Sequence, residues 1–292
     1  MQFLVYILAY PILWLISILP FRIFYWFSDF VFFLVYHVLG YRRKVVKENL
    51  ALALPHLSEA ERKVIAKKFY QHMCDMFLEM IKTMSITPEE MDKRFVVTNM
   101  EVIREYEEKG KSAVLVTSHY ASFEWILTIN TKLRFKGIGV YKRLANPYFD
   151  RLVRKIRSKY DTELVETRKT IPLMAQNQRN GVLSLYGLAS DQSPKLDRIF
   201  HSSTFMGIEV PVHTGSEMLA KKYDLSVIFF KVKKIKRGYY EGTFIPICDN
   251  PRDYPDFKVT EMYLGEVEKQ ILEAPEYYLW THKRWKHRVE KK

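Results

Sequence analysis

The stretch Val114-Leu-Val-Thr-Ser-His-Tyr-Ala-Ser-Phe-Glu-Trp-Ile126 joins a buried strand to a helix, and the rest of the chain is organised around it. The apolar run at residues 113–117 predicts the strand. The helix is predicted by an apolar stripe made of Trp125, Ile126, Ile129 and Leu133. His119 therefore lies at a strand-to-helix turn, and Glu124 lies in the first turns of the helix that follows.

This arrangement predicts a general-base pair. On one continuous helix, a spacing of five residues would place His119 and Glu124 about 140° apart. On a turn that enters a helix, their side chains can fold back and meet. A carboxylate bound to one imidazole nitrogen raises the basicity of the other, which then deprotonates a hydroxyl group. The alternative is a structural histidine at a strand end and a solvated helix glutamate.

Length, charge and cysteine count restrict which partners and which kinds of site the chain is expected to have. The chain has 292 residues, a formal charge of +13 and two cysteines, which form neither a zinc spacing nor a disulfide framework. The charge indicates an anionic partner, namely nucleic acid, acidic lipid headgroups or an acidic protein. No nucleic-acid-binding motif is present, so no nucleic-acid partner is expected. His201 and His213 lack metal-ligand spacing, so no metal is expected either.

The first forty residues predict a membrane anchor. Two apolar runs, at residues 3–19 and 23–39, come close to the roughly 20 residues that span a bilayer. The basic cluster Tyr41-Arg-Arg-Lys44 follows directly, and by the positive-inside rule it places the rest of the chain in the cytoplasm. The anchor is either a single span or a helical hairpin that enters one leaflet. A buried pair of helices is the remaining alternative.

Residues 41–92 are predicted as a helical lead-in to the catalytic domain, which covers residues 41–292. Ser58-Glu-Ala-Glu61 is a capping box, and its helix is predicted to reach about residue 84. The methionines of this helix are predicted to lie in the core, with acyl-chain binding as the alternative. Asp75 and Glu79 are interpreted as acids on its surface.

Residues 93–292 predict an α/β core. Strands are predicted at residues 95–97, 113–117, 137–141, 164–165, 182–189, 225–231 and 239–245. Helices are predicted at residues 99–109, 146–159, 170–181, 215–223 and 255–272. This alternation is typical of a mostly parallel or mixed central sheet flanked by helices, with ligands at the carboxyl ends of its strands. His119 and Asp191 both follow such ends.

Several blocks in register carry a resemblance to the bacterial lipid A late acyltransferases, the lauroyl and myristoyl transferases of the glycerolipid acyltransferase superfamily. After the apolar N-terminus they are Tyr41-Arg-Arg-x-x-x-x-Asn-Leu50, His119-x4-Glu124, Gly139-Val-Tyr-Lys-Arg-Leu-Ala-Asn-Pro147, Arg157-Ser158, Ser190-Asp-Gln192, Thr214-Gly215 and Pro275-Glu-Tyr-Tyr-Leu-Trp-Thr-His-Lys-Arg284. His-x4-Glu alone is a weak signal, but the blocks together cover nearly the whole chain.

The resemblance implies a bacterial inner-membrane enzyme whose catalytic domain faces the cytoplasm. It would move an acyl group from an acyl carrier protein or coenzyme A thioester to a hydroxyl of a lipid A precursor or another anionic membrane lipid. His119 would act as the base with Glu124, and the hydroxyl oxygen would attack directly. The absence of a G-x-S-x-G nucleophile elbow agrees with this route. No cofactor is expected besides the thioester co-substrate.

Other residues receive roles from the same resemblance. Arg157, and after it Arg154, would stabilise the oxyanion or bind an acceptor phosphate, the alternative being a solvated basic helix face. Lys142 and Arg143 would bind an anionic headgroup. Asp191 and Gln192 would either bind a sugar or order their loop. The basic and aromatic tail at residues 283–288 would lie on the bilayer interface or be disordered.

Two departures from the family pattern leave the acceptor open. The chain has Tyr141-Lys-Arg143 where the family has Tyr-Arg-Pro, and Asp191-Gln-Ser-Pro194 where the family has Asp-Gln-Asp followed by a glycine. A lysophospholipid or an amino-acid lipid is therefore an alternative acceptor. A more remote alternative is a non-catalytic protein that binds the membrane surface.

Overall fold

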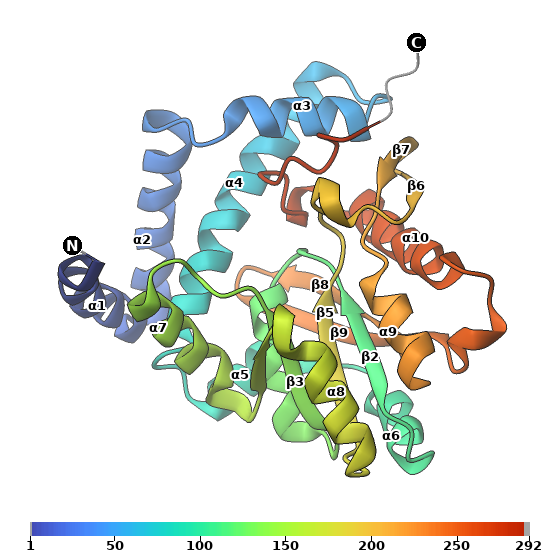
Figure 1. The fold of residues 1–292 in the computed structure, drawn as a ribbon. Helices are drawn as coiled ribbons and strands as arrows, with labels where there is room; N and C mark the ends of the chain where they lie inside the picture. Colours follow the sequence, from blue (N-terminus) through green and yellow to red (C-terminus); the bar gives the residue numbers. More distant parts are fainter. Residues whose placement is uncertain (1, 289–292) are drawn as a thin grey trace.

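A seven-stranded mixed sheet forms the centre of the computed structural model, which describes residues 2–288 (Figure 1). Its strand order is β1-β9-β8-β2-β5-β3-β4, and all neighbouring strands are parallel except the β8–β9 hairpin. The strands are β1 (Phe95–Val97), β2 (Ala113–Thr117), β3 (Lys136–Tyr141), β4 (Glu163–Glu166), β5 (Ser184–Ala189), β8 (Ser226–Lys236) and β9 (Tyr239–Cys248). The predicted α/β class and mixed sheet are confirmed.

Helices cover both faces of this sheet. The helices after the N-terminal pair are α3 (Arg43–Ala53), which packs on α4, and α4 (Glu59–Lys82), α5 (Pro88–Arg94), α6 (Met100–Glu108), α7 (Pro147–Arg157), α8 (Thr170–Arg179), α9 (Gly215–Tyr223) and α10 (Lys258–Glu273). The predicted capping box opens α4, because Ser58 and Glu61 exchange side-chain and backbone hydrogen bonds. A small two-stranded sheet, β6 (Ser202–Phe205) with β7 (Ile208–Pro211), was not predicted.

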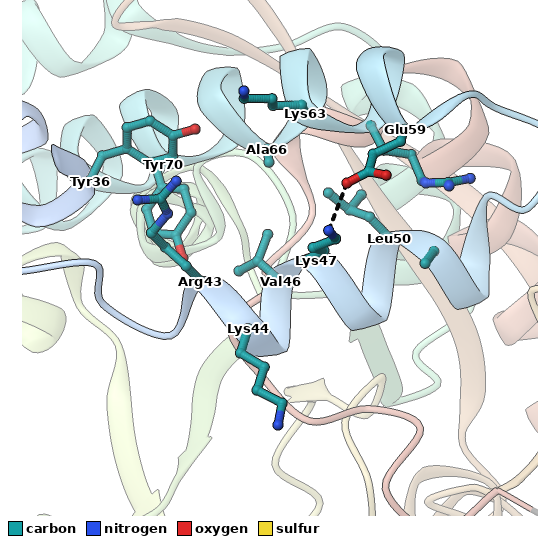
Figure 2. Close-up of a pocket in the computed structure, with 12 residues that line it drawn as sticks. Tyr36, Arg43, Lys44, Val46, Lys47, Leu50, Glu59, Lys63, Ala66 and Tyr70 are labelled. Carbon is teal, nitrogen blue, oxygen red and sulfur yellow. Dashed lines mark hydrogen bonds and ion pairs between the residues drawn. The ribbon is translucent and has the colours of Figure 1, made fainter.

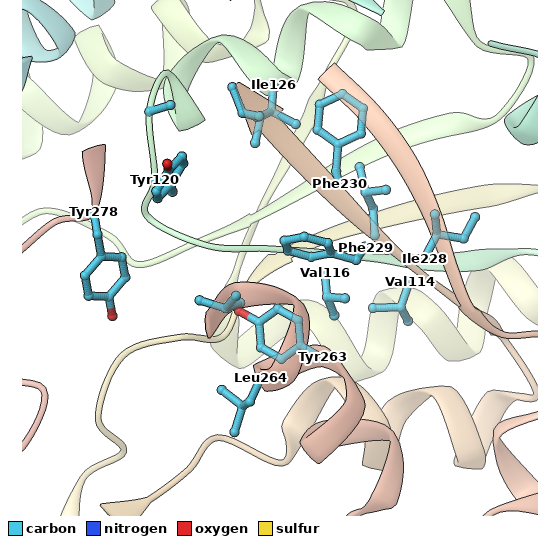
Figure 3. Packing of buried hydrophobic residues seen from close by; sticks show 14 of the residues in the cluster. Val114, Val116, Tyr120, Ile126, Ile228, Phe229, Phe230, Tyr263, Leu264 and Tyr278 are labelled. Carbon is cyan, nitrogen blue, oxygen red and sulfur yellow. The ribbon is translucent and has the colours of Figure 1, made fainter. Parts of the chain in front are cut away.

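The hydrophobic core is continuous from β2 to its neighbours (Figure 3). Val114 and Val116 lie on the side of the sheet that α10 covers, next to Tyr263 and Leu264. Ile126 and Phe230 lie on the opposite side. Because β2 is buried on both faces, its sequence is a continuous apolar run instead of an alternating one.

The segment after His119 is a 3₁₀ helix, η2 (Phe123–Lys132), where an α-helix was expected. Thr128 and Thr131 each donate a hydrogen bond from the hydroxyl to the carbonyl three residues earlier. These bonds, together with neighbouring β-branched side chains, compete with regular α-helical geometry. The expected apolar stripe still reaches the core, since Trp125, Ile126 and Ile129 are buried.

Two apolar helices precede the catalytic domain. They are α1 (Gln2–Ile18) and α2 (Phe21–Phe33), which continues as a π-helix at Leu34–Val38. Among the described residues, only the segment Phe21–Val38 is long and apolar enough to cross a bilayer. Lys82 at the end of α4 donates to the carbonyl groups of Ser17 and Leu19, and thereby binds the carboxyl end of α1.

Asp75 and Glu79 are buried, so their interpretation as surface acids was wrong. Helix α4 lies between α2 and the β8–β9 hairpin, which no local sequence pattern reveals (Figure 1). Asp75 accepts hydrogen bonds from Ser28 and from Arg237. Glu79 accepts from the hydroxyl groups of Tyr25 and Tyr240, both at 2.8 Å. These acids fasten the apolar α2 to the catalytic domain.

Candidate active site

The carboxyl ends of three adjacent parallel strands form the site. Thr117, the last residue of β2, pairs with Ala189, the last residue of β5. His119 and Asp191 each lie two residues further on, so they emerge side by side. Lys142 and Arg143 follow β3, which pairs with the other side of β5. His119 and Asp191 thus both follow carboxyl ends of neighbouring strands, as their sequence context predicted.

His119 and Asp191 form a close pair. The His119 Nδ1 lies 2.7 Å from Asp191 Oδ1, and the His119 backbone N–H donates to Oδ2 at 3.2 Å. The Asp191 side chain is 1% exposed and that of His119 is 22% exposed. A carboxylate at Nδ1 selects the tautomer in which Nδ1 carries the proton, which leaves Nε2 as a proton acceptor. Within residues 2–288, no hydrogen bond occupies Nε2.

Electrostatics raise the basicity of the His119 imidazole. Burial alone lowers the pKa of His119, but the charge and hydrogen bond of Asp191 outweigh burial and raise the pKa above 6.5. Burial favours the neutral form of Asp191, yet His119 holds the pKa of this carboxyl below 3.8. Each group therefore stabilises the charged form of the other.

Glu124 does not contact the imidazole, so the predicted His119–Glu124 contact was wrong. Instead, the Phe123 ring lies against the imidazole with 5.0 Å between ring centroids. The Glu124 carboxylate accepts two hydrogen bonds from Arg157 of α7, at 2.9 Å from Nε and 2.6 Å from Nη2. The partner of His119 is Asp191 in the loop after β5, 72 positions away in the sequence, and no local spacing indicates this contact.

The Glu124–Arg157 pair is partly shielded from water. The Glu124 side chain is 6% exposed and that of Arg157 is 25% exposed. Burial lowers the pKa of Arg157, but Glu124 outweighs this and raises it. The two charges also act on His119, whose pKa Glu124 raises and Arg157 lowers. The structure thus brings two of the predicted residues together as a bidentate ion pair beside the base.

A C-terminal segment at residues 275–284 packs against the His119 turn and the Asp191 loop. Its Tyr277 carbonyl accepts from the Ala121 N–H at 2.9 Å, and its Leu279 N–H donates to the His119 carbonyl at 3.0 Å. Its His282 Nε2 accepts from the Ser193 backbone N–H at 3.1 Å. Burial lowers the pKa of His282 to about 4, so this imidazole stays neutral. The segment therefore holds both the His119 turn and the Asp191 loop.

Asn49 and Arg42 in turn hold the C-terminal segment. The Asn49 side-chain amide donates to the carbonyl groups of Trp280 and His282, both at 2.7 Å. Arg42 donates to the Thr281 carbonyl at 2.9 Å. Asn49 and His282 belong to blocks that carry the family resemblance, but no function was predicted for either residue. The interpretation of residues 283–288 as a surface or disordered tail was wrong for Arg284 and Trp285, which are each 1% exposed.

A small cavity of about 10 Å³ lies between His119 and α4. Its lining is mostly apolar and consists of Phe69, His72, Met73, Met76, His119, Ala121, Phe123, Tyr277 and Leu279. Met73 and Met76 are buried, as their core assignment predicted. His72 was not singled out by the sequence. Its Nδ1 lies 3.2 Å from Lys234 Nζ, and burial followed by the Lys234 charge lowers its pKa well below 6.5.

The other predicted site residues lie at the rim. Lys142 and Arg143 are exposed on the loop after β3, and Arg154 is exposed on α7. Gln192 is partly exposed next to Asp191. The structure places these four near the strand ends without bringing any of them into contact with His119.

Comparison with known proteins identifies the family. The sequence profile described as bacterial lipid A biosynthesis acyltransferase matches residues 1–287. The chain belongs to this family. It is therefore an O-acyltransferase, as the sequence blocks predicted.

This acyltransferase is similar to a lipid A biosynthesis lauroyltransferase of Escherichia coli strain K12, with 27% identity over 97% of the chain and 92% of the relative. A lipid A biosynthesis acyltransferase of Haemophilus influenzae is also 27% identical, over 86% of the chain and 79% of the relative. A palmitoleoyltransferase of lipid A biosynthesis from E. coli strain K12 is 22% identical over 95% of the chain and 89% of the relative.

One of the chain's departures from the family pattern, at Ser193, takes part in specific hydrogen bonds in the structure. Ser193, which stands where an aspartate was expected, donates from its hydroxyl to the Arg284 carbonyl at 2.6 Å. It also donates from its backbone to His282. In this acyltransferase, the departure at Ser193 therefore contributes to the contact between the Asp191 loop and the C-terminal segment.

Proposed function

We propose that this acyltransferase transfers a fatty acyl group from the thioester of acyl carrier protein to a hydroxyl group of a lipid A precursor at the bacterial inner membrane. The observation that carries the proposal is the His119–Asp191 pair, whose free Nε2 lies at the carboxyl edge of the sheet. The family supports the acceptor, because its curated relatives are named for lipid A biosynthesis.

In the proposed reaction, Nε2 of His119 takes the proton of the acceptor hydroxyl group. The hydroxyl oxygen attacks the thioester carbonyl carbon, and a C–O bond forms in a tetrahedral oxyanion. The oxyanion then collapses, the C–S bond breaks and the carrier leaves as a thiolate. His119 returns its proton to the sulfur, so the imidazole is neutral again. Asp191 stabilises the imidazolium that exists between these steps.

Arg157 is the proposed cation for the oxyanion or for a phosphate of the acceptor. Glu124 becomes a positioning residue in this scheme, since its two hydrogen bonds fix the guanidinium while Nη1 stays outside them. The Ala121 N–H is not a free donor for the oxyanion, because it binds the Tyr277 carbonyl. Lys142, Arg143 and Arg154 would contact the anionic acceptor at the rim.

Charge and hydropathy support the proposed partners and location. An excess of 13 positive charges favours both an acidic carrier protein and anionic lipids. Helix α2 with its π-helical extension is apolar enough to cross the bilayer, and Arg42, Arg43, Lys44 and Lys47 follow it. By the positive-inside rule this cluster favours a cytoplasmic catalytic domain.

The test is an acyl-transfer assay with membranes that contain the full chain, its His119→Ala variant or a His56→Ala control. His56 is an exposed histidine outside the site. Labelled acyl carrier protein and coenzyme A thioesters are offered separately, with a tetra-acylated lipid A precursor and a lysophospholipid as competing acceptors. We expect transfer from the carrier protein to the lipid A precursor that only His119→Ala abolishes.

Other results would revise separate parts of the proposal. Transfer only to the lysophospholipid would retain the base and change the acceptor, and a preference for coenzyme A would change the donor. Full activity of His119→Ala would disprove the proposed mechanism. No transfer by any variant would mean that neither the donors nor the acceptors offered are substrates of this acyltransferase.

A further inference from the structure

A groove of about 500 Å³ lies between α3 and α4, outside the active site (Figure 2). Its volume falls within the range of about 300–1,000 Å³ that is typical of small-molecule sites. Val46, Leu50 and Ala66 form an apolar floor, and the rings of Tyr36 and Tyr70 close one end. The remaining lining residues are Arg43, Lys44, Lys47, Ala51, Glu59, Arg62 and Lys63.

The charges of this groove are unbalanced, with five cationic side chains and one carboxylate. Lys47 is paired with Glu59 at 2.6 Å, and Arg62 donates to the carbonyl groups of Leu54 and Leu57. Arg43 and Lys63 form no ion pair with any residue of the described chain. Arg43 lies over the Tyr36 ring at 4.9 Å from its centroid. Two uncompensated cations thus flank an apolar floor, which suits a ligand with an anionic head and an apolar body.

The groove begins where the membrane-spanning candidate ends. Tyr36 belongs to the π-helix Leu34–Val38, an irregular form of helix that is frequent at functional sites. Val38, the last residue of this π-helix, and Leu39 after it are 62% and 72% exposed, so exposed apolar side chains lie within three positions of the groove residue Tyr36. At the membrane location proposed above, this apolar end of α2 contacts the bilayer and brings the cationic rim to the depth of the phospholipid headgroups.

The groove is separate from the catalytic centre because α4 presents different residues to each. Arg62, Lys63, Ala66 and Tyr70 line the groove, whereas the cavity beside His119 is lined by Phe69, His72, Met73 and Met76. No residue lines both spaces.

We propose that this groove binds one anionic glycerophospholipid of the bilayer, as a site distinct from that of the acyl acceptor. Arg43 and Lys63 bind the headgroup phosphate, and the beginning of an acyl chain lies along Ala51 and Ala66, the apolar lining residues that are not fully buried. The exposed apolar residues Val38 and Leu39, close in sequence to the groove residue Tyr36, favour a lipid over an acidic protein. The inference rests on the proposed membrane location, but it is independent of the proposed reaction.

The test is native mass spectrometry of the full chain in detergent, with phosphatidylglycerol or phosphatidylcholine added. The double variant Arg43→Gln/Lys63→Gln is compared with the control Lys67→Gln/Lys258→Gln, which removes the same charge from exposed positions outside the groove. We expect the natural chain and the control to prefer phosphatidylglycerol. The groove variant loses about tenfold in phosphatidylglycerol affinity, since it lacks both charge-assisted contacts.

Equal phosphatidylglycerol binding by the two variants, or no preference over phosphatidylcholine, would overturn the proposal. Loss of acidic carrier protein binding alone would also overturn it and would mark the groove as a protein-docking surface. Acyl transfer to the acceptor in detergent without added phospholipid is measured in parallel and is expected to be unchanged in the groove variant. This readout separates failure of the lipid site from failure of the proposed reaction, because lipid binding does not require His119.

Discussion

The imidazole of His119 and the carboxylate of Asp191 are joined at 2.7 Å although 72 positions separate them in the chain. The junction exists because β2 and β5 are parallel neighbours and end in register at Thr117 and Ala189. A turn of two residues after each strand then brings the base and its acid together. Strand register therefore sets the protonation behaviour of the site.

Asp191→Asn tests this dependence through pH. His119 must be neutral to accept a proton, and its raised pKa places the acidic limb of the kcat/KM profile above pH 6.5. Removal of the Asp191 charge lowers that pKa and moves the limb to lower pH. We expect kcat to fall by about 10²–10⁴-fold, the usual contribution of general base catalysis. The exposed Asp197→Asn is the matched control, and an unmoved limb in Asp191→Asn would contradict this reading.

A double-mutant cycle tests whether Glu124 acts through Arg157. Lysine cannot replace the bidentate guanidinium, so Glu124→Gln, Arg157→Lys and the double variant should lose similar activity, well short of additive. Arg157→Ala leaves a buried carboxylate unpaired and should cost about 3–5 kcal/mol of unfolding free energy. Arg151→Lys on the same helix is the control. If Glu124→Gln shifted the acidic limb of the kcat/KM profile by as many pH units as Asp191→Asn does, the main effect of Glu124 would be on His119 and not on Arg157.

Asn49→Ala tests the contact that holds the C-terminal segment. Two buried carbonyl groups lose their donor, at a cost of about 1–3 kcal/mol in unfolding free energy. Activity should fall as well, since Trp280 and His282 belong to the segment that supports the His119 turn. Thermal unfolding and transfer rates are measured together, with the exposed Asn180→Ala as control. If neither the unfolding temperature nor the transfer rate changed in Asn49→Ala, Asn49 would not support the site.

Glu79→Gln tests the buried acid between α2 and the hairpin. Burial, then the Asp75 charge, raises the pKa of Glu79 from 4.5 to about 7. The folded state thus keeps a proton that the unfolded state releases, so this residue's contribution to stability falls as pH rises from about 4.5 to about 7. Histidines whose pKa is lowered by folding add stability as pH rises, and so oppose the effect of Glu79 in the natural chain. The measurement is therefore the difference in Tm between the natural chain and Glu79→Gln, plotted against pH. A flat difference would contradict the raised pKa.

Parts of this site could be predicted because they follow from local pattern. The apolar run before His119 and the strand before Asp191 place both residues at one edge of a parallel sheet, whatever the details of packing. The partner of Glu124 could not be predicted, since it depends on a 3₁₀ helix and on where α7 packs. The burial of Asp75 and Glu79 depends on α2, and that of Arg284 on β7, whose Pro211 carbonyl accepts from it. The partner of Glu124 and the burial of these three side chains all depend on contacts between segments far apart in the sequence.

The two hydrogen bonds of Asn49 also affect when the site can form during translation. They join positions 231 and 233 residues apart, so they form only after the ribosome has released nearly the whole chain. The apolar helices α1 and α2 emerge at the start of translation and are available for membrane insertion throughout. During that interval the His119 turn lacks its support. The apolar helices are therefore complete long before the site has the support that catalysis requires.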